Sequence, residues 1–359
     1  MKEIEAVIGE SRYTIEIGNR LLLDSQRLKE KISGSGKCAV VLSNYLYDLH
    51  WEYLIEVLGG YTNKELFLMQ DSEENKNYIY AENFLQGFAV KGLARDSLVW
   101  SIGGGVVGDF AGYCASLYMR GINIVQCPTT LLAMVDAGIG GKVAVNLQSG
   151  KNLVGSFHQP ILVVSDTVFL STLPDREIKC GLAEIIKHSL IGDAASMDIL
   201  LKHNLESVKD ESVLSELVYH SAKFKVSVVA ADEKEEGLRA ILNFGHTVGH
   251  AVESFMAYKD ISHGEAVAAG ILAESRISKE AGLLSADGLE LVVDLLKRYD
   301  LFDNSINCGS DGVIEHMKFD KKNKENSVRF VLLKAPGEAL YNQTVPNDII
   351  NRAVEETLA

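Results

Sequence analysis

Three histidines and one glutamate have the residue types and spacing of a metal site. The segment Asn243-Phe-Gly-His-Thr-Val-Gly-His250 places His246 and His250 four residues apart on one face of an expected helix, and His263 follows within eighteen residues of His246. Glu184 lies upstream in an apolar segment. A glutamate and two histidines with an open position form a catalytic type of zinc site. Either both His246 and His250 are ligands, or one is a ligand and the other transfers protons or orients the site.

A glycine-rich segment between an expected strand and an expected helix has the composition of a phosphate-binding loop. In Ser101-Ile-Gly-Gly-Gly-Val-Val-Gly-Asp109, three glycines fit the pattern G-x-G-x-x-G. Glycine lets the backbone approach a pyrophosphate, and the helix N-terminus offers free N–H groups. Since this pattern usually follows the first strand of its domain, we expect a variant dinucleotide-binding domain. A tight turn without a ligand is the alternative.

Several cations lie in apolar or glycine-rich surroundings of an acidic chain. A single lysine of this kind often only extends its stem along the surface. Converging cations, however, hold phosphate and carboxylate groups, and arginine offers two parallel donors. The cations are Arg120, Lys142, Lys151, Lys187, Lys225, Arg239, Lys321 and Lys322.

The elements that must position these residues fall into two parts. Strand-like runs alternate with helical segments in residues 1–170, which predicts a mostly parallel sheet covered on both faces. These runs are residues 38–43, 65–69, 98–102, 122–126 and 161–165, with helices at 51–58 and 75–88. Helical periodicity then dominates at 181–191, 213–231, 249–256 and 264–281, and a strand signal returns only at 328–333. We predict an α/β domain over residues 1–170 and a helical domain over residues 171–359.

Composition narrows the class of protein further. The 359 residues include 35 Lys plus Arg and 49 Asp plus Glu, a formal net charge of −14, which argues against a nucleic-acid partner. No stretch approaches the roughly 18 apolar residues of a membrane span, and the first ten residues lack the pattern of a secretory signal. The five cysteines are scattered and odd in number, which indicates reduced thiols. We therefore expect a cytoplasmic protein with no membrane partner.

Taken together and in order, these segments resemble the 3-dehydroquinate synthase family of the sugar-phosphate cyclase superfamily. The resemblance covers nearly the whole chain. Its carriers are Gly103-Gly-Gly-Val-Val-Gly-Asp109, Pro128-Thr-Thr130, Asp136-Ala-Gly-Ile-Gly-Gly-Lys142, Gly150-Lys-Asn-Leu-Val-Gly155, Gly181-Leu-Ala-Glu184, the segment 243–250 and His263-Gly-Glu-Ala-Val267.

The resemblance implies an N-terminal NAD-binding α/β domain of variant Rossmann-like type, an all-α C-terminal metal-binding domain, and a cleft between them. It also implies a homodimer. The implied reaction converts a sugar phosphate, 3-deoxy-D-arabino-heptulosonate 7-phosphate, into 3-dehydroquinate and phosphate. This is a step of the shikimate pathway toward aromatic amino acids, in which NAD acts as a catalyst beside Zn²⁺ or Co²⁺.

Site residues follow from the resemblance position by position. The implied metal ligands are Glu184, His246 and His263. The implied catalytic residues are Glu235, His250 and Lys142. The implied substrate contacts are Arg120 (from the neighbouring subunit), Asp136, Lys142, Asn152, Lys187, Lys225, Arg239, Asn243 and one of Lys321 and Lys322. The implied NAD contacts are Asn44, Glu73, Lys76, Gly104, Gly105, Val106, Asp109, Thr129, Thr130, Lys151, Phe169 and Thr172.

Four positions depart from the family pattern. Asn44 replaces an Asp, Ser72 and Cys180 replace a glycine and a small polar residue, and Lys-Val-Ala-Val-Asn146 replaces Lys-Thr-Gly-Val/Ile-Asn. Asn44 can still hydrogen-bond a ribose hydroxyl, but without the strength of a charged acceptor. These departures affect NAD affinity more than the chemistry.

Two other functions share this architecture. A second sugar-phosphate cyclase, such as 2-deoxy-scyllo-inosose synthase, would act on glucose 6-phosphate, whereas Arg239 and Asn243 fit a substrate with a carboxylate. A metal-dependent NAD polyol dehydrogenase of the glycerol dehydrogenase kind would need no phosphate pocket. A binding protein without catalysis is disfavoured because a candidate is present at all three metal positions.

Overall fold

The computed structural model describes residues 1–257, 261–301, 309–318 and 328–358. The chain forms two compact units, Met1–Leu173 and Pro174–Ala359. The boundary expected after residue 170 falls within the 3-10 turn η4 (Thr167–Thr172), which ends the first unit. None of the described helices is both long and apolar enough to span a lipid bilayer.

A seven-stranded sheet forms the centre of the first unit. Its spatial order is β1-β2-β9-β6-β5-β3-β4, and every neighbouring pair is parallel except β1 and β2. The strands are β1 (Lys2–Ile8), β2 (Ser11–Gly18), β3 (Cys38–Ser43), β4 (Lys64–Met69), β5 (Leu98–Gly103), β6 (Asn123–Pro128) and β9 (Leu162–Asp166).

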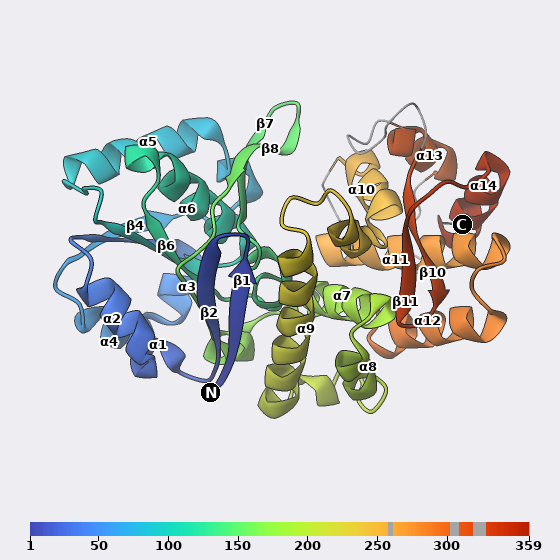
Figure 1. The fold of residues 1–359 in the computed structure, drawn as a ribbon, viewed down its shortest axis with the longest axis horizontal. Coiled ribbons are helices and arrows are strands. Elements are labelled where there is room, and N and C mark those ends of the chain that lie inside the picture. The colour runs from blue at the N-terminus through green and yellow to red at the C-terminus, as the bar shows by residue number, and fades with distance from the viewer. Residues whose placement is uncertain (258–260, 302–308, 319–327, 359) are drawn as a thin grey trace. The chain divides into compact units, whose positions relative to one another are not determined.

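Helices cover both faces of this sheet, as the alternating sequence predicted (Figure 1). Because successive strand residues point to opposite faces, Val40 and Leu42 of β3 pack with the helices of one side, and Ala39 and Val41 pack with those of the other. The first side holds α1 (Leu21–Asp24), α2 (Gln26–Ser33), α3 (Asn44–Leu49) and α4 (Trp51–Gly59). The second side holds α5 (Tyr78–Val90) and α6 (Gly105–Leu117).

Shorter elements connect the strands of this unit. A hairpin of β7 (Lys142–Leu147) and β8 (Gly150–Phe157) forms its own two-stranded sheet. Both this hairpin and the β1–β2 hairpin lie outside the strands that the sequence predicted. The single-turn elements are η1 (Glu73–Asn75), η2 (Tyr118–Arg120) and η3 (Ala133–Ala137).

The second unit is helical, with one small two-stranded sheet. Its helices are α7 (Asp175–Ile191), α8 (Ala194–Leu200), α9 (Glu211–Ala231), α10 (His246–Phe255), α11 (His263–Glu280), α12 (Ala286–Arg298), α13 (Ser310–Lys318) and α14 (Asn347–Leu358), with the 3-10 turns η5 (Ser207–Lys209) and η6 (Leu238–Asn243). The strands β10 (Phe330–Ala335) and β11 (Glu338–Gln343) pair antiparallel, which accounts for the strand signal at 328–333.

Glycines let three helices of this unit pack almost backbone to backbone. A Cβ on Gly270 of α11 would lie 1.8 Å from the carbonyl oxygen of Gly245, and one on Gly249 of α10 would lie 2.9 Å from that of Ala266. A Cβ on Gly264 would lie 2.3 Å from Cα of Cys180 on α7. The first residues of α10 and α11 are therefore held close to α7.

We expect Gly270→Ala to destabilise the second unit by at least about 3 kcal/mol, because the new methyl would overlap a backbone oxygen that cannot rotate away. Gly59→Ala is the matched control, since a Cβ at this helical position meets nothing within 4 Å. Urea unfolding of the two variants beside the parent measures the difference. A Gly270→Ala protein as stable as Gly59→Ala would contradict the packing described here.

Candidate metal and dinucleotide site

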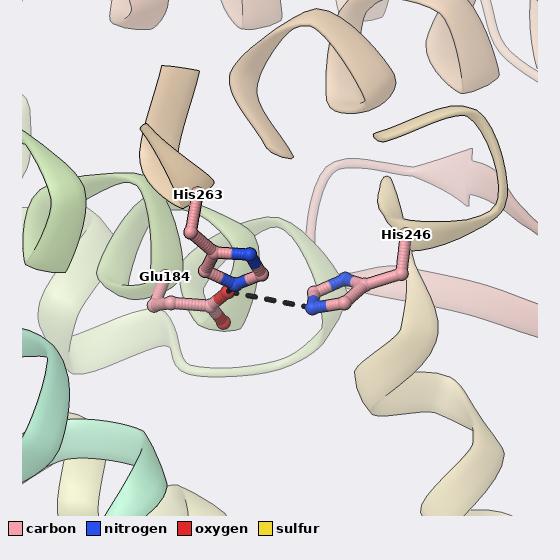
Figure 2. A group of neighbouring side chains, drawn as sticks. All are labelled: Glu184, His246 and His263. Atoms are coloured by element: carbon pink, nitrogen blue, oxygen red, sulfur yellow. Dashed lines mark ion pairs between the residues drawn. The ribbon is translucent and has the colours of Figure 1, made fainter. Parts of the chain in front are cut away.

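Three side chains from three helices converge in the second unit (Figure 2). Glu184 comes from α7, and His246 and His263 are the first residues of α10 and α11. Nε2 of His246 lies 3.5 Å from Oε1 of Glu184, and Nε2 of His263 lies 3.4 Å from the same oxygen. One candidate ligand atom from each residue lies within 4.8 Å of the others. A divalent metal could take all three as ligands, leaving a position open to substrate.

Contacts on the far side of each ring fix which nitrogen faces Glu184. Nδ1 of His246 lies 3.1 Å from the carbonyl oxygen of Phe244, and Nδ1 of His263 lies 3.4 Å from Oε2 of Glu253. Because carbonyl and carboxylate oxygens only accept, each ring can keep a proton on Nδ1. A ring that keeps this proton and has none on Nε2 presents the Nε2 lone pair on the side of Glu184, as a metal ligand requires.

A buried carboxylate anchors the helix that begins with His246. Glu274 of α11 is fully buried and accepts hydrogen bonds from the backbone N–H groups of Gly245, Thr247 and Val248, at 2.9, 3.0 and 3.2 Å. The residue before α10 supplies no side-chain cap of its own. Glu274 therefore satisfies the free N–H groups that a helix start leaves, and it holds the backbone around His246.

The charges around Glu184 keep its carboxylate ionised. Burial alone would raise the pKa of Glu184, but the Lys187 ammonium, then His246 and His263, hold this pKa well below its usual value. Both of its oxygens are buried, and the carboxylate lies within ion-pair distance of Lys187, His246 and His263. An ionised carboxylate of this kind fits a cation.

The two histidines respond differently to the same surroundings. Burial, reinforced by Lys187, lowers the pKa of His246 well below its usual value. Burial also acts to lower the pKa of His263, but interactions with Glu184 and Glu253 raise it to about 10. His246 is therefore already neutral, whereas His263 must give up a proton when a metal binds.

One further predicted residue lies beside this group, and two others contact each other. His250 lies one helical turn after His246 on α10, with ring centroids 5.1 Å apart, and 6.4 Å from the ring of His263. Asn243 donates a 2.6 Å hydrogen bond to Glu235, whose φ of +61° is rare for a residue with a side chain. The structure thus brings His250 beside the metal group and joins Glu235 to Asn243.

Asp232 organises the loop that carries these residues. Its carboxylate accepts hydrogen bonds from the backbone N–H groups of Glu236, Gly237 and Arg239. The Arg239 side chain is only 3% exposed and donates to the carbonyl oxygen of Glu233. Together these bonds fix a guanidinium inside the second unit. Lys187 and Lys225 are also buried there, at 1% and 6% exposure.

The glycine-rich segment lies where the strand order of the sheet reverses. The chain goes from β3 outward to β4 and then returns to β5 on the other side of β3. At such a switch point, helix starts diverge and leave room for a ligand beyond the carboxyl ends of the strands. Gly103 ends β5, Gly104 precedes α6, and Asn44 directly follows β3. Sheet topology therefore supports the predicted dinucleotide position.

Small residues are needed around this turn. A Cβ on Gly104 would meet the side chain of Thr130 at 3.1 Å, and one on Gly105 would meet Ala137 at 3.3 Å. The backbone N–H of Thr129 donates to the carbonyl oxygen of Gly103. The loop after β6 thus packs against the glycine turn, and it places Thr129 and Thr130 next to Gly104.

A hydrogen-bond network joins the other predicted dinucleotide residues to the β7–β8 hairpin. Lys76 is 4% exposed and donates from Nζ to Asp109 at 2.5 Å and to Asn152 at 2.6 Å. Asn146 donates to Glu73 at 2.7 Å and accepts from the backbone N–H of Asn152 at 2.8 Å. Sequence analysis did not assign Asn146 to the site and named it only as the last residue of a segment that departs from the family pattern.

The remaining predicted residues are distributed as follows. Thr172 contacts His50, with 2.7 Å between Oγ1 and Nε2, and the ring of Phe169 lies edge-on to His50. Asp136 is half-buried, Val106 lies on the first turn of α6, and Lys142 and Lys151 lie on the β7–β8 hairpin. Lys321 and Lys322 lie outside the described residues. The predicted substrate residues therefore belong to both units.

A sheet with a glycine turn at its switch point, joined to a helical unit with a Glu-His-His group, defines a class of enzymes that combine a dinucleotide with a divalent metal. Comparison with known proteins narrows this class. Residues 66–180 match the model of the 3-dehydroquinate synthase N-terminal domain, and residues 181–323 match the model of its C-terminal domain. A 3-dehydroquinate synthase from Leptospira interrogans is 41% identical over 328 residues, 91% of this chain and 90% of the relative.

Solved structures of other cyclases share the fold over the whole chain. A 2-deoxy-scyllo-inosose synthase in complex with carbaglucose-6-phosphate, NAD⁺ and Co²⁺ superposes with a TM-score of 0.90 at 26% identity, covering 99% of each chain. The 2-epi-5-epi-valiolone synthase of Streptomyces hygroscopicus, with NAD⁺ and Zn²⁺ bound, gives 0.88 at 27% identity, covering 98% of each. This chain belongs to the 3-dehydroquinate synthase family.

Proposed function

We propose that this chain converts 3-deoxy-D-arabino-heptulosonate 7-phosphate into 3-dehydroquinate and phosphate, with NAD and a divalent metal. The observation that carries the proposal is the group of Glu184, His246 and His263, in a chain of this family. The enzyme is then a phosphate-eliminating lyase of the shikimate pathway.

Glu184, His246 and His263 would hold the metal, and the turn of Gly104 and Gly105 would receive the pyrophosphate of NAD. When bound, the metal polarises substrate hydroxyl oxygens and NAD takes up and returns a hydride. Zn²⁺ or Co²⁺ is the proposed ion, since one neutral imidazole, one imidazole that can lose its proton and one carboxylate suit either.

The chain's own residues would then bind substrate and move protons. Glu235 and His250 are the proposed proton-transfer residues, since His250 lies beside the metal group and Glu235 contacts Asn243, three residues before His246. Lys142 is the proposed cationic partner of developing negative charge. The buried Arg239 fits a carboxylate, which it can hold through two parallel hydrogen bonds. The other proposed substrate contacts are Arg120, Asp136, Asn152, Lys187, Lys225, Asn243 and one of Lys321 and Lys322.

We propose a homodimer in which Arg120 reaches the phosphate bound by the partner subunit. Its surroundings support an interface. Met119 and Arg120 are consecutive non-glycine residues with positive φ, at +51° and +69°, and such backbone strain persists mostly where function requires it. Leu117 and Met119 expose large apolar side chains beside it, at 47% and 45%. A cytoplasmic location is also proposed, and the four described cysteines, which are buried thiols, support it.

A second cyclase activity is the competing function, because a 2-deoxy-scyllo-inosose synthase shares the fold so closely. Arg239 argues against glucose 6-phosphate as substrate. That sugar has no carboxylate, so the two parallel donors of this guanidinium would find no matching planar acceptor on it.

Phosphate release tests the proposal directly. With NAD and Zn²⁺ present, we expect release from 3-deoxy-D-arabino-heptulosonate 7-phosphate with kcat/KM at least about 10³-fold higher than from glucose 6-phosphate or sedoheptulose 7-phosphate. A site built to hydrogen-bond a substrate carboxylate rejects analogues that lack this group. Glycerol should give no net NADH. A preference for either of the other sugar phosphates would reject the proposed substrate, and steady NADH formation from glycerol would indicate a dehydrogenase.

A further inference from the structure

Glu253 contacts one of the proposed metal ligands without belonging to the ligand group. It lies on α10, is 8% exposed, and places Oε2 3.4 Å from Nδ1 of His263. The other ring nitrogen of His263 lies 3.4 Å from Glu184. His263 is therefore held between two carboxylates, one on each ring nitrogen.

We propose that Glu253 is a positioning residue of the metal centre, which sets the ring orientation and tautomer of His263 so that Nε2 faces the metal. This inference rests on the proposed function, because it presumes that Glu184, His246 and His263 bind a metal. Glu253 itself contacts Nδ1, on the other side of the ring from the nitrogen that faces Glu184, so its place is behind the ligand.

Helix packing explains why Glu253 reaches His263. The close approaches between α10 and α11 pair Gly245 with Gly270 and Gly249 with Ala266. From the first pair, whose Gly245 directly precedes α10, to the second, the contact moves four residues forward on one side and four back on α11, as expected for antiparallel helices. About one turn further, four residues forward on α10 and three back on α11, Glu253 contacts His263. The glycines that bring the two backbones together thus fix this contact as well.

Charge gives Glu253 a second effect on the centre. A divalent ion bound by one carboxylate and two neutral imidazoles keeps a net charge of about +1, which is unfavourable in a buried place. The carboxylate of Glu253 would compensate that charge through the imidazole, and it would raise the basicity of the ligand nitrogen. His246 differs, since a neutral backbone carbonyl, that of Phe244, holds its Nδ1.

Zinc affinity of the full-length chain, measured by chelator competition, tests this role. We expect Glu253→Ala to weaken zinc binding about 10- to 100-fold, the range found for partners of ligand histidines, and to alter the visible absorption of the Co²⁺-loaded protein. Glu253→Gln keeps an oxygen acceptor without the charge, so its affinity should lie between those of the parent and Glu253→Ala.

The control is Asp193→Asn, which changes a buried carboxylate of the same unit that hydrogen-bonds Ser196 at the start of α8. It should bind zinc as the parent does. Thermal unfolding of the metal-free proteins separates a loss of affinity from a loss of fold. If Glu253→Ala does not fold, Glu253→Gln supplies the comparison, and its zinc affinity should be at least about threefold below that of Asp193→Asn.

The comparison uses whichever of the two Glu253 variants folds. If its zinc affinity is within threefold of that of the control and its Co²⁺ spectrum is unchanged, the positioning role is overturned. A parent chain that binds neither Zn²⁺ nor Co²⁺ would instead reject the proposed metal centre, and this inference with it. If the parent chain binds metal but releases no phosphate, the proposed reaction is rejected. The zinc affinities of the Glu253 variants then still decide the role of Glu253.

Discussion

His246→Ala is expected to lose both its bound divalent metal and its turnover. His246 supplies one of three converging donor atoms, with Nε2 3.5 Å from Glu184, and alanine would leave a buried carboxylate and one histidine. Two donors do not complete a zinc site of this kind. Since the metal contributes several kcal/mol to stabilising charge in the transition state, kcat/KM should fall by at least about 10³-fold.

Metal content by atomic absorption, together with phosphate release, measures this effect. His220→Ala is the matched control, because His220 lies on α9 and pairs with Glu216 at i,i+4. That variant should retain the metal and the activity of the parent. A His246→Ala protein that still carries one zinc per chain would show that the ligand set is assigned wrongly.

The fold was largely predictable because its signals are local. Central strands such as β3 and β5 are short, continuous apolar runs, because the sheet they form is buried on both faces. The length of each run and the turn residues on either side of it therefore identify the strand. The predicted strand at 65–69 corresponds to β4, and the helix expected from residue 75 begins at Tyr78, where the Asn77 side chain accepts from the backbone N–H of Tyr80. A cap of this kind moves a boundary by a few residues without changing the element.

The start of α10 shows what a local pattern cannot reveal. The spacing of His246 and His250 fits one helical face, but the helical periodicity predicted a helix only from residue 249, whereas α10 begins at His246. The residue before it, Gly245, has a φ of +77° and no capping side chain. Its cap comes from Glu274, 28 residues after His246 in the sequence, and only tertiary packing brings that carboxylate to the helix start. Long-range capping leaves no signal in the neighbouring residues.

The same distinction applies to the site. The histidine and glutamate motifs identified the residues that the structure brings together around Glu184, because such polar side chains are uncommon in apolar segments. Glu253 escaped notice although it follows His246 by seven residues, or about two helical turns, on the same helix. Its partner, His263, comes from the next helix, so the pairing depends on the packing of α10 against α11 and not on spacing within α10.

Arg239→Ala should strongly reduce turnover while leaving the metal in place, and it thereby separates substrate binding from metal binding. The Arg239 side chain is 3% exposed and is held by Glu233, and its backbone N–H is held by Asp232, so alanine would remove a fixed cation from a buried position. Truncating one member of a buried charge pair costs about 2–5 kcal/mol, so kcat/KM for the heptulosonate phosphate should fall on the order of 10³-fold.

Arg239→Lys sharpens the test, because lysine keeps the charge but lacks the planar guanidinium that holds a carboxylate through two parallel hydrogen bonds. If Arg239 binds a substrate carboxylate, the lysine variant should regain only part of the lost activity, and both variants should contain as much zinc as the parent. Because that carboxylate is what distinguishes the proposed substrate from glucose 6-phosphate, the alanine variant should also lose most of its preference between the two. Full activity in Arg239→Ala would remove this residue from the substrate site, and it would reopen the choice between the two cyclase reactions.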